Sequence, residues 1–218
     1  MIRICPSTNP CDEEKLVDYA KEMQAYDIRF MHCDVMDGVF VENKCLSVEK
    51  IREITEETQI GLDIHLMVSE PLMVLDKFLE LPANFITMHY EAFKNSSDIL
   101  RAVDKIHKKG VLAGISIKPN TNISAIKPLL PYIDLVLIMS VEPGKSGQEF
   151  IEGSIGKIKE IYSFIVQNQL RVKIEVDGGI NKDNIRDVVN AGASMVVIGS
   201  ALYNSEDRKN FVEYVQRI

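Results

Sequence analysis

The chain has 218 residues and is 46% hydrophobic, which is enough apolar surface for the core of one domain. Its formal net charge of −7 argues against a surface for nucleic acid, and no apolar run is long enough to span a bilayer. The four cysteines form no CxxC pair and the N-terminus carries no apolar leader, so we expect reduced thiols in a cytoplasmic protein.

Short β-branched or apolar runs alternate with longer amphipathic stretches along the whole chain, which is typical of repeated βα units. The predicted strands cover residues 2–5, 28–34, 60–67, 85–89, 111–117, 135–140, 172–176 and 195–198. The clearest predicted helices cover residues 12–26, 46–57, 71–81, 97–109 and 152–169, with Ser97 or Asp98 as a helix cap. Eight such units predict an α/β fold with one domain over residues 1–218, a single-domain (β/α)8 TIM barrel. An open doubly wound sheet would show the same alternation, but the even spacing of eight units favours the closed barrel.

The active site of such a barrel forms at the C-terminal ends of its strands, and these ends are polar here. Because side chains alternate along a strand, His32 and Asp34 share one face, and both reach the barrel mouth when Cys33 packs outward against helices. His65 and Asp177 end two further strands. Two histidines and two carboxylates suit one divalent metal ion, and Zn, Fe(II), Mn and Co all remain open.

Two carboxylates at one site also suit proton transfer next to a carbonyl group. Inversion at carbon needs a base on one face and an acid on the other, and Asp34 and Asp177 come from strands far apart around the barrel. A divalent ion between them would stabilise the negative charge that develops on an enediolate. The residues therefore predict an epimerase. Of the remaining histidines, we expect His89 to hydrogen-bond near the site without a catalytic role and His107 to be solvated.

Glycine-rich turns follow the sixth, seventh and eighth predicted strands, where barrels often bind phosphate through backbone N–H groups. The residues of these turns expected to bind substrate are Gly144, Lys145, Ser146, Gly147, Gly178, Gly179, Gly199 and Ser200. A small sugar phosphate is thus the predicted partner, with no nucleic acid and no membrane.

Four motifs in the same order resemble the ribulose-phosphate 3-epimerase family, and the likeness runs from Cys5-Pro6-Ser7 to Gly199-Ser200-Ala201. The motifs are His32-Cys33-Asp34-Val35-Met36-Asp37-Gly38 with Phe40-Val41, Asp63-Ile64-His65-Leu66-Met67-Val68, Met139-Ser140-Val141-Glu142-Pro143-Gly144 and Glu175-Val176-Asp177-Gly178-Gly179-Ile180. This resemblance implies reversible interconversion of D-ribulose 5-phosphate and D-xylulose 5-phosphate in the pentose phosphate pathway. It also implies a homo-oligomer, either a dimer or a hexamer.

The same resemblance assigns roles to individual residues. The implied metal ligands are His32, Asp34, His65 and Asp177. The two aspartates would be the acid and base, Ser7 and His65 would touch the substrate, and the three glycine turns would hold its phosphate.

Three segments depart from the family's usual sequence and bear on the substrate. The departures are Lys145-Ser146 in place of Phe-Gly or Phe-Ala, Val39 and Glu42 in place of His and Pro, and Thr8-Asn9 in place of Ile followed by Leu or Met. They leave open 3-epimerisation of a hexulose 6-phosphate such as D-allulose 6-phosphate. Two lesser alternatives are a Schiff-base lyase or isomerase using Lys118 or Lys173, and a non-catalytic barrel that only binds a sugar phosphate.

Overall fold

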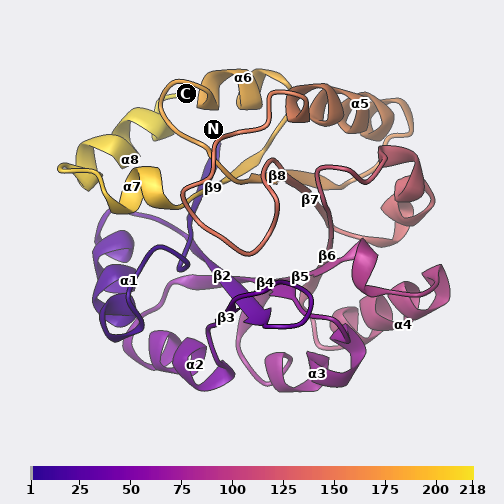
Figure 1. Cartoon of the computed structure of the whole chain (residues 1–218), viewed down its shortest axis with the longest axis horizontal. Helices are drawn as coiled ribbons and strands as arrows, with labels where there is room; N and C mark the ends of the chain where they lie inside the picture. The colour runs from indigo at the N-terminus through magenta and orange to yellow at the C-terminus, as the bar shows by residue number, and fades with distance from the viewer. Residues whose placement is uncertain (1) are drawn as a thin grey trace.

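Parallel strands form the wall of a closed barrel in the computed structural model, which describes residues 2–218 (Figure 1). In sheet order the strands of this described part are β1 (Arg3–Pro6), β9 (Met195–Ile198), β8 (Lys173–Asp177), β7 (Leu135–Met139), β6 (Leu112–Ile117), β5 (Ala83–His89), β4 (Gly61–Met67) and β2 (Phe30–Asp37). A short β3 (Lys44–Cys45) pairs antiparallel with β2. The ring closes between β1 and β2, where Ser7 forms a parallel bridge with His32 and the Thr8 N–H donates to the His32 carbonyl at 2.9 Å. The predicted (β/α)8 barrel is confirmed.

Helices surround the strands on the outside (Figure 1). They are α1 (Leu16–Ala25), α2 (Val48–Glu57), α3 (Pro71–Phe78), α4 (Ser96–His107), α5 (Ser154–Gln167), α6 (Ile185–Asn190), α7 (Ser200–Tyr203) and α8 (Arg208–Gln216). The 3-10 segments are η1 (Glu13–Lys15), η2 (Tyr90–Ala92), η3 (Ile123–Ala125) and η4 (Lys127–Tyr132). Between β6 and β7 only η3 and η4 form, because Pro131 inside η4 cannot donate a backbone hydrogen bond to a longer helix.

The fourth helix shows how the sequence sets these elements. In α4 the buried residues Ile99, Ala102, Val103 and Ile106 recur at three- and four-residue spacing, so one face packs on the barrel. The predicted cap was wrong by two to three residues. Asn95 caps the helix by accepting a hydrogen bond from the Asp98 N–H, which places Ser97 and Asp98 in the first turn.

Side chains that alternate along each strand divide the core into two parts. Outward side chains such as Cys33 belong to a large apolar cluster between strands and helices, as predicted. Inward side chains near the N-terminal ends of the strands, including Phe85, Leu135 and Met195, fill the barrel interior. The polar inward residues therefore lie above an apolar floor. None of the helices within residues 2–218 combines the length and apolar character needed to cross a bilayer.

Candidate active site

Four side chains from β2, β4 and β8 converge inside the barrel mouth. One ligand atom from each of His32, Asp34, His65 and Asp177 lies within 4.8 Å of the other three. The closest atoms are His32 Nε2, His65 Nδ1 and Asp34 Oδ1, which are separated by 3.3 to 3.4 Å, and Asp177 Oδ2 lies 4.0 Å from His32 Nε2. Ligands around a tetrahedral ion are roughly 3.4 Å apart when each bond is about 2.1 Å long. The spacing of the cluster therefore fits a divalent cation.

The register between β2 and β4 explains this convergence. It pairs Asp34 with His65 and also pairs His32 with Asp63, so both strands bring a histidine and an aspartate to the same two levels of the barrel. Because neighbouring residues at one level face the same way, the four side chains share the interior. Asp63 was not singled out from the sequence, although it precedes His65 by two residues on the inward face.

Electrostatics set the two cluster carboxylates apart. Burial raises the pKa of Asp34, but the neighbouring imidazoles, first among them the positive charge of His32, outweigh burial and hold that pKa below its usual range. Burial, together with the negative charge of Asp34, raises the pKa of Asp177 to about 7. Within residues 2–218 these carboxylates have imidazoles as ion-pair partners, and no Lys or Arg. A buried group of this composition can hold a cation.

Each histidine of the cluster has a hydrogen-bond partner at the ring nitrogen that faces away from the cluster. His32 Nδ1 lies 2.6 Å from Asp63 Oδ2. His65 Nε2 lies 2.9 Å from His89 Nε2, and His89 Nδ1 lies 3.2 Å from Glu91 Oε2. The expected hydrogen bond of His89 near the site is confirmed, and burial lowers the pKa of His89 to about 4. Metal-binding histidines commonly have such partners, which fix the ring orientation.

A second buried group lies beneath His32. Cys5, Asp63 and Glu175 are fully buried, with ligand-type atoms within 4.8 Å of one another. Both Glu175 carboxyl oxygens and Asp63 Oδ1 lack a hydrogen-bond partner in the part of the chain that the structure describes. Burial, followed by the negative charge of Asp63, raises the pKa of Glu175 well above its usual range. Glu175 was also missed, although it precedes Asp177 by two residues on the same face.

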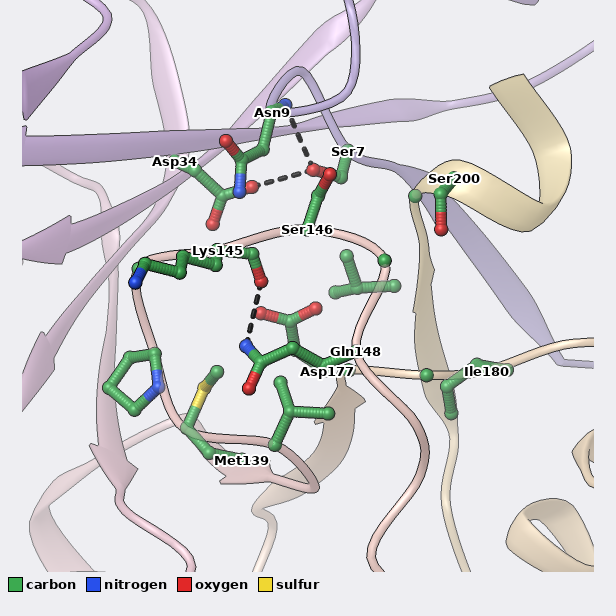
Figure 2. A pocket seen from close by; sticks show the side chains of 18 of the residues that line it. Ser7, Asn9, Asp34, Met139, Lys145, Ser146, Gln148, Asp177, Ile180 and Ser200 are labelled. Carbon is green, nitrogen blue, oxygen red and sulfur yellow. Dashed lines mark hydrogen bonds between the residues drawn. The ribbon is translucent and has the colours of Figure 1, made fainter. Parts of the chain in front are cut away.

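A cavity of about 230 Å³ opens above the cluster and gathers most residues predicted to bind substrate (Figure 2). Its lining includes Ser7, Asn9, Asp34, Gly144, Lys145, Ser146, Gly147, Asp177, Gly178, Gly179, Gly199 and Ser200. Ser7 Oγ donates to Asp34 Oδ2 at 2.6 Å. His65 lies below this lining and is fully buried.

The turn after β8 owes its shape to its glycines. Gly178 and Gly179 have φ of 120° and 66°, in the region that side chains disfavour. A Cβ on Gly179 would lie 2.7 Å from the Phe150 Cα, so the turn packs tightly against the segment after β7. Ser140 Oγ holds the same turn, because its one O–H lies within reach of the Asp177 carbonyl at 2.9 Å and the Gly178 carbonyl at 2.7 Å and can donate to either. This hydroxyl was not recognised from the sequence.

The loop after β7 is tied to the loop after β2. Asn43 Nδ2 donates to the Gly144 carbonyl at 2.7 Å, and Lys145 Nζ lies 3.3 Å from Glu42 Oε2. Figure 2 shows the Lys145 side chain directed away from Ser200. Lys145 therefore lines the cavity with its stem, while its ammonium group pairs with Glu42 at the rim.

The two lysines considered for Schiff-base chemistry lie elsewhere. Lys173 begins β8, at the end of the barrel opposite the cluster. Lys118 places its ammonium 4.1 Å from the centre of the Phe40 ring, and it is not part of the cavity lining. Neither arrangement aims an amine at the cluster, so the site does not favour that alternative.

Comparison with known proteins agrees with these features. The family model described as "Ribulose-phosphate 3 epimerase family" matches residues 3–203. A ribulose-phosphate 3-epimerase of Aquifex aeolicus is 41% identical over 81% of this chain and 78% of its own length. One from Bacillus subtilis is 34% identical over 99% of both chains. Among solved structures, a 3-hexulose-6-phosphate synthase aligns over 99% of both chains with a TM-score of 0.74 at 16% identity, which is a likeness of fold alone.

Proposed function

Because the chain belongs to the ribulose-phosphate 3-epimerase family and is a carbohydrate epimerase, we propose that it interconverts D-ribulose 5-phosphate and D-xylulose 5-phosphate by two-aspartate proton transfer at C3. The observation that carries this proposal is the pairing of Asp34 and Asp177 in one buried cluster beneath a cavity lined by glycine turns. The catalytic domain would span residues 1–218. Membership of the family is also our reason for proposing a cytoplasmic homo-oligomer in the pentose phosphate pathway.

The two aspartates would act from opposite faces of the substrate carbon. One carboxylate removes the C3 proton, and the other aspartic acid delivers a proton to the opposite face, which inverts the configuration. Ser7 Oγ would keep the Asp34 carboxylate in position through its 2.6 Å hydrogen bond.

His32, Asp34, His65 and Asp177 would hold one divalent ion, with Zn, Fe(II), Mn and Co all compatible. When bound, such an ion supplies Lewis-acid stabilisation for negative charge on the substrate's ketone and hydroxyl oxygens. Asp63 and His89 would orient the two imidazoles toward it. Since the buried Asp34 and the partly exposed Asp177 have no Lys or Arg partner within residues 2–218, the charge of the cluster supports this assignment.

The phosphate would bind at the opposite end of the cavity. Its proposed ligands are the backbone of Gly144 to Gly147, Gly178 and Gly179, and Gly199 with Ser200. Positive φ at Gly144, Gly147, Gly178 and Gly179 supports this, because such turns direct successive N–H groups to one side. The Lys145 ammonium would reach the phosphate only by leaving Glu42.

The hexulose alternative has one specific observation in its favour. Asn9 places a polar amide in the cavity lining where the family's usual residue is apolar. A polar group at this position suits a substrate with one more hydroxyl group.

The test is proton exchange in D2O, followed by NMR at C3, with metal-loaded protein and each ketose phosphate separately. Deuterium incorporation with epimer formation on D-ribulose 5-phosphate is expected, and Asp34→Asn and Asp177→Asn should slow it on the order of 10³-fold. Asp104→Asn, in a surface ion pair with Lys108, is the matched control and should change nothing. Turnover of D-allulose 6-phosphate alone would establish that the substrate is a hexulose 6-phosphate. No exchange on either sugar would overturn both and favour the binding barrel.

A further inference from the structure

A chain of three side chains runs from the cluster through His89 at the end of β5 to the partly exposed Glu91 in η2. His65 Nε2 contacts His89 Nε2 at 2.9 Å, and His89 Nδ1 contacts Glu91 Oε2 at 3.2 Å. Both imidazoles are fully buried, and their rings stack with centroids 4.9 Å apart and planes 29° apart. We propose that Glu91 is a positioning residue that fixes, through His89, the tautomer of His65 whose Nδ1 lone pair faces a divalent cation. The inference rests on the metal centre of the proposed function.

The direction of the hydrogen bonds follows from the carboxylate at the end of the chain. An ionised carboxylate only accepts, so His89 must donate from Nδ1 to Glu91. Neutral His89 then has a lone pair at Nε2, and that lone pair can only accept, so His65 must donate from Nε2. His65 is left with a lone pair at Nδ1, the nitrogen that lies 3.3 Å from His32 Nε2 and 3.4 Å from Asp34 Oδ1. Ser116 Oγ, 3.4 Å from His65 Nε2, is compatible because a hydroxyl can accept.

Glu91 is itself fixed on the side away from His89. Its Oε1 accepts the Lys118 N–H at 2.8 Å and the Thr121 hydroxyl. Lys157 Nζ binds the carbonyls of that same loop, including Thr121 at 2.6 Å. Burial raises the pKa of Glu91, but the hydrogen bonds from His89, Thr121 and Lys118 outweigh burial and lower it to about 2. Glu91 is therefore an ionised, immobile acceptor at neutral pH.

His32, the other histidine of the cluster, is oriented by a carboxylate directly, with no second histidine between them. Asp63 accepts directly from His32 Nδ1 at 2.6 Å, which leaves Nε2 facing the cluster. Two histidines on adjacent strands thus present opposite ring nitrogens to one point, and each is oriented by a carboxylate. A purely structural role for Glu91, holding the loop at Lys118 to Thr121, predicts no effect on cation binding, so the two roles can be separated.

The experiment compares Glu91→Gln with Asp134→Asn, using Co²⁺ alone in competition with a chromophoric chelator. Asp134 is a matched control, because it accepts from His107 Nε2 at 2.7 Å and from the Ala113 N–H at 2.9 Å, away from the cluster. A glutamine amide can donate to His89 Nδ1, which would reverse the chain and put a proton on His65 Nδ1. Glu91→Gln should therefore weaken Co²⁺ binding about 10- to 100-fold and change the visible absorption of bound Co²⁺. Asp134→Asn should leave both unchanged.

A second measurement needs no variant. In the metal-free native protein, ¹⁵N NMR should find His65 as the Nε2–H tautomer, and an Nδ1–H tautomer would overturn the inference. Unchanged Co²⁺ affinity in Glu91→Gln would also overturn it, even when unfolding temperature falls. Failure of the proposed function looks different: a native protein that epimerises neither ketose phosphate but shows the affinity difference would overturn that function and leave this inference standing.

Discussion

The barrel mouth has two sides that are built in different ways. The histidine side, formed by His32, His65 and His89 on β2, β4 and β5, consists of fully buried side chains that contact one another. The glycine side, formed by the turns after β7, β8 and β9, consists of backbone around a cavity, and the glycines after β7 and β8 have left-handed conformations. The first side depends on which side chains are present, while the second depends on where side chains are absent. Removal of a side chain or of the bound ion should therefore damage the histidine side most. Addition of a side-chain atom should damage the glycine side most.

Removal of the divalent ion should give the largest effect, and it should act on the histidine side. A chelator is expected to lower kcat on the order of 10³-fold. Asp34 and Asp177 would lose the positive charge that balances them, and the substrate oxygens would lose the Lewis acid that stabilises their negative charge. Restoring the ion at 100 times its Kd should stabilise the fold by about 2.7 kcal/mol, which is a rise in Tm of roughly 5–10 °C for a domain of this size. Calorimetry with and without the ion measures this.

Removal of the ion also tests whether the glycine side is independent of the histidine side. Amide hydrogen exchange at Gly144 and Gly199 on the glycine side should stay the same when the ion is removed, since neither residue belongs to the cluster. Equal activity before and after complete removal of metal would contradict the assignment of the cluster.

Addition of one methyl group should break the glycine side. Gly179→Ala places a Cβ 2.7 Å from the Phe150 Cα and 3.0 Å from the Gln148 carbonyl oxygen, and it strains a residue whose φ is 66°. We expect a loss of about 2–3 kcal/mol in unfolding free energy and a higher KM for the sugar phosphate. Urea unfolding and steady-state kinetics measure the two effects.

Gly156→Ala is the matched control for this substitution. Gly156 lies in α5, has no positive φ, and leaves open space where an alanine Cβ would lie, with no heavy atom of the described residues within 4 Å. Alanine should therefore be neutral there or stabilise the helix. If Gly179→Ala binds Co²⁺ as tightly as the native protein while its KM rises, the two sides are independent. A parallel loss of Co²⁺ affinity would show that they are coupled through Asp177.

Loss of one hydroxyl on the glycine side should have a smaller effect. Ser140→Ala removes the hydroxyl next to the Asp177 and Gly178 carbonyls and should cost about 1 kcal/mol, because the Gly178 carbonyl loses this donor while the Asp177 carbonyl still accepts from the residue 140 N–H at 2.8 Å. Ser163→Ala, which removes a similar bond to the Lys159 carbonyl on the exposed side of α5, should cost less. Equal destabilisation of the two variants in urea would contradict a special role for Ser140.

The two sides also differ in how far the sequence could predict them. Strand alternation predicted that His32 and Asp34 point inward with Cys33 outward, because a period of two depends only on local sequence. Asp63 contacts His32 on another strand, and Glu91 reaches the cluster only because its neighbour His89 contacts His65 on another strand; such pairings are properties of the folded sheet. Their spacing of two residues from a histidine was present but has no meaning until the neighbour is known.

On the glycine side the sequence predicted which turns line the cavity, but not where their side chains point. Lys145 was expected to bind phosphate, a role that remains a prediction, and its ammonium group pairs with Glu42, which is 103 residues away along the chain. Such a contact between two loops depends on loop conformations that no periodic pattern encodes. Ser140 escaped attention for a similar reason, because its partners are backbone carbonyls of another strand end.

The smallest effect should come from the ion pair that joins the loops after β2 and β7. Glu42 and Lys145 are 86% and 62% exposed, so their attraction is screened by solvent, and Glu42→Lys or Lys145→Glu should each change KM less than about fivefold. The double exchange Glu42→Lys with Lys145→Glu restores opposite charges and should return KM toward the native value when the pair holds the loops together. If Lys145 instead leaves Glu42 to bind phosphate, Lys145→Glu should raise KM far more than Glu42→Lys, and the double exchange should not restore it. Steady-state KM for the native protein, the two single variants and the double variant decides between these results. The ordering of the four KM values identifies the role of Lys145. Repeating the measurement at high salt should weaken the loop contact and leave that ordering the same.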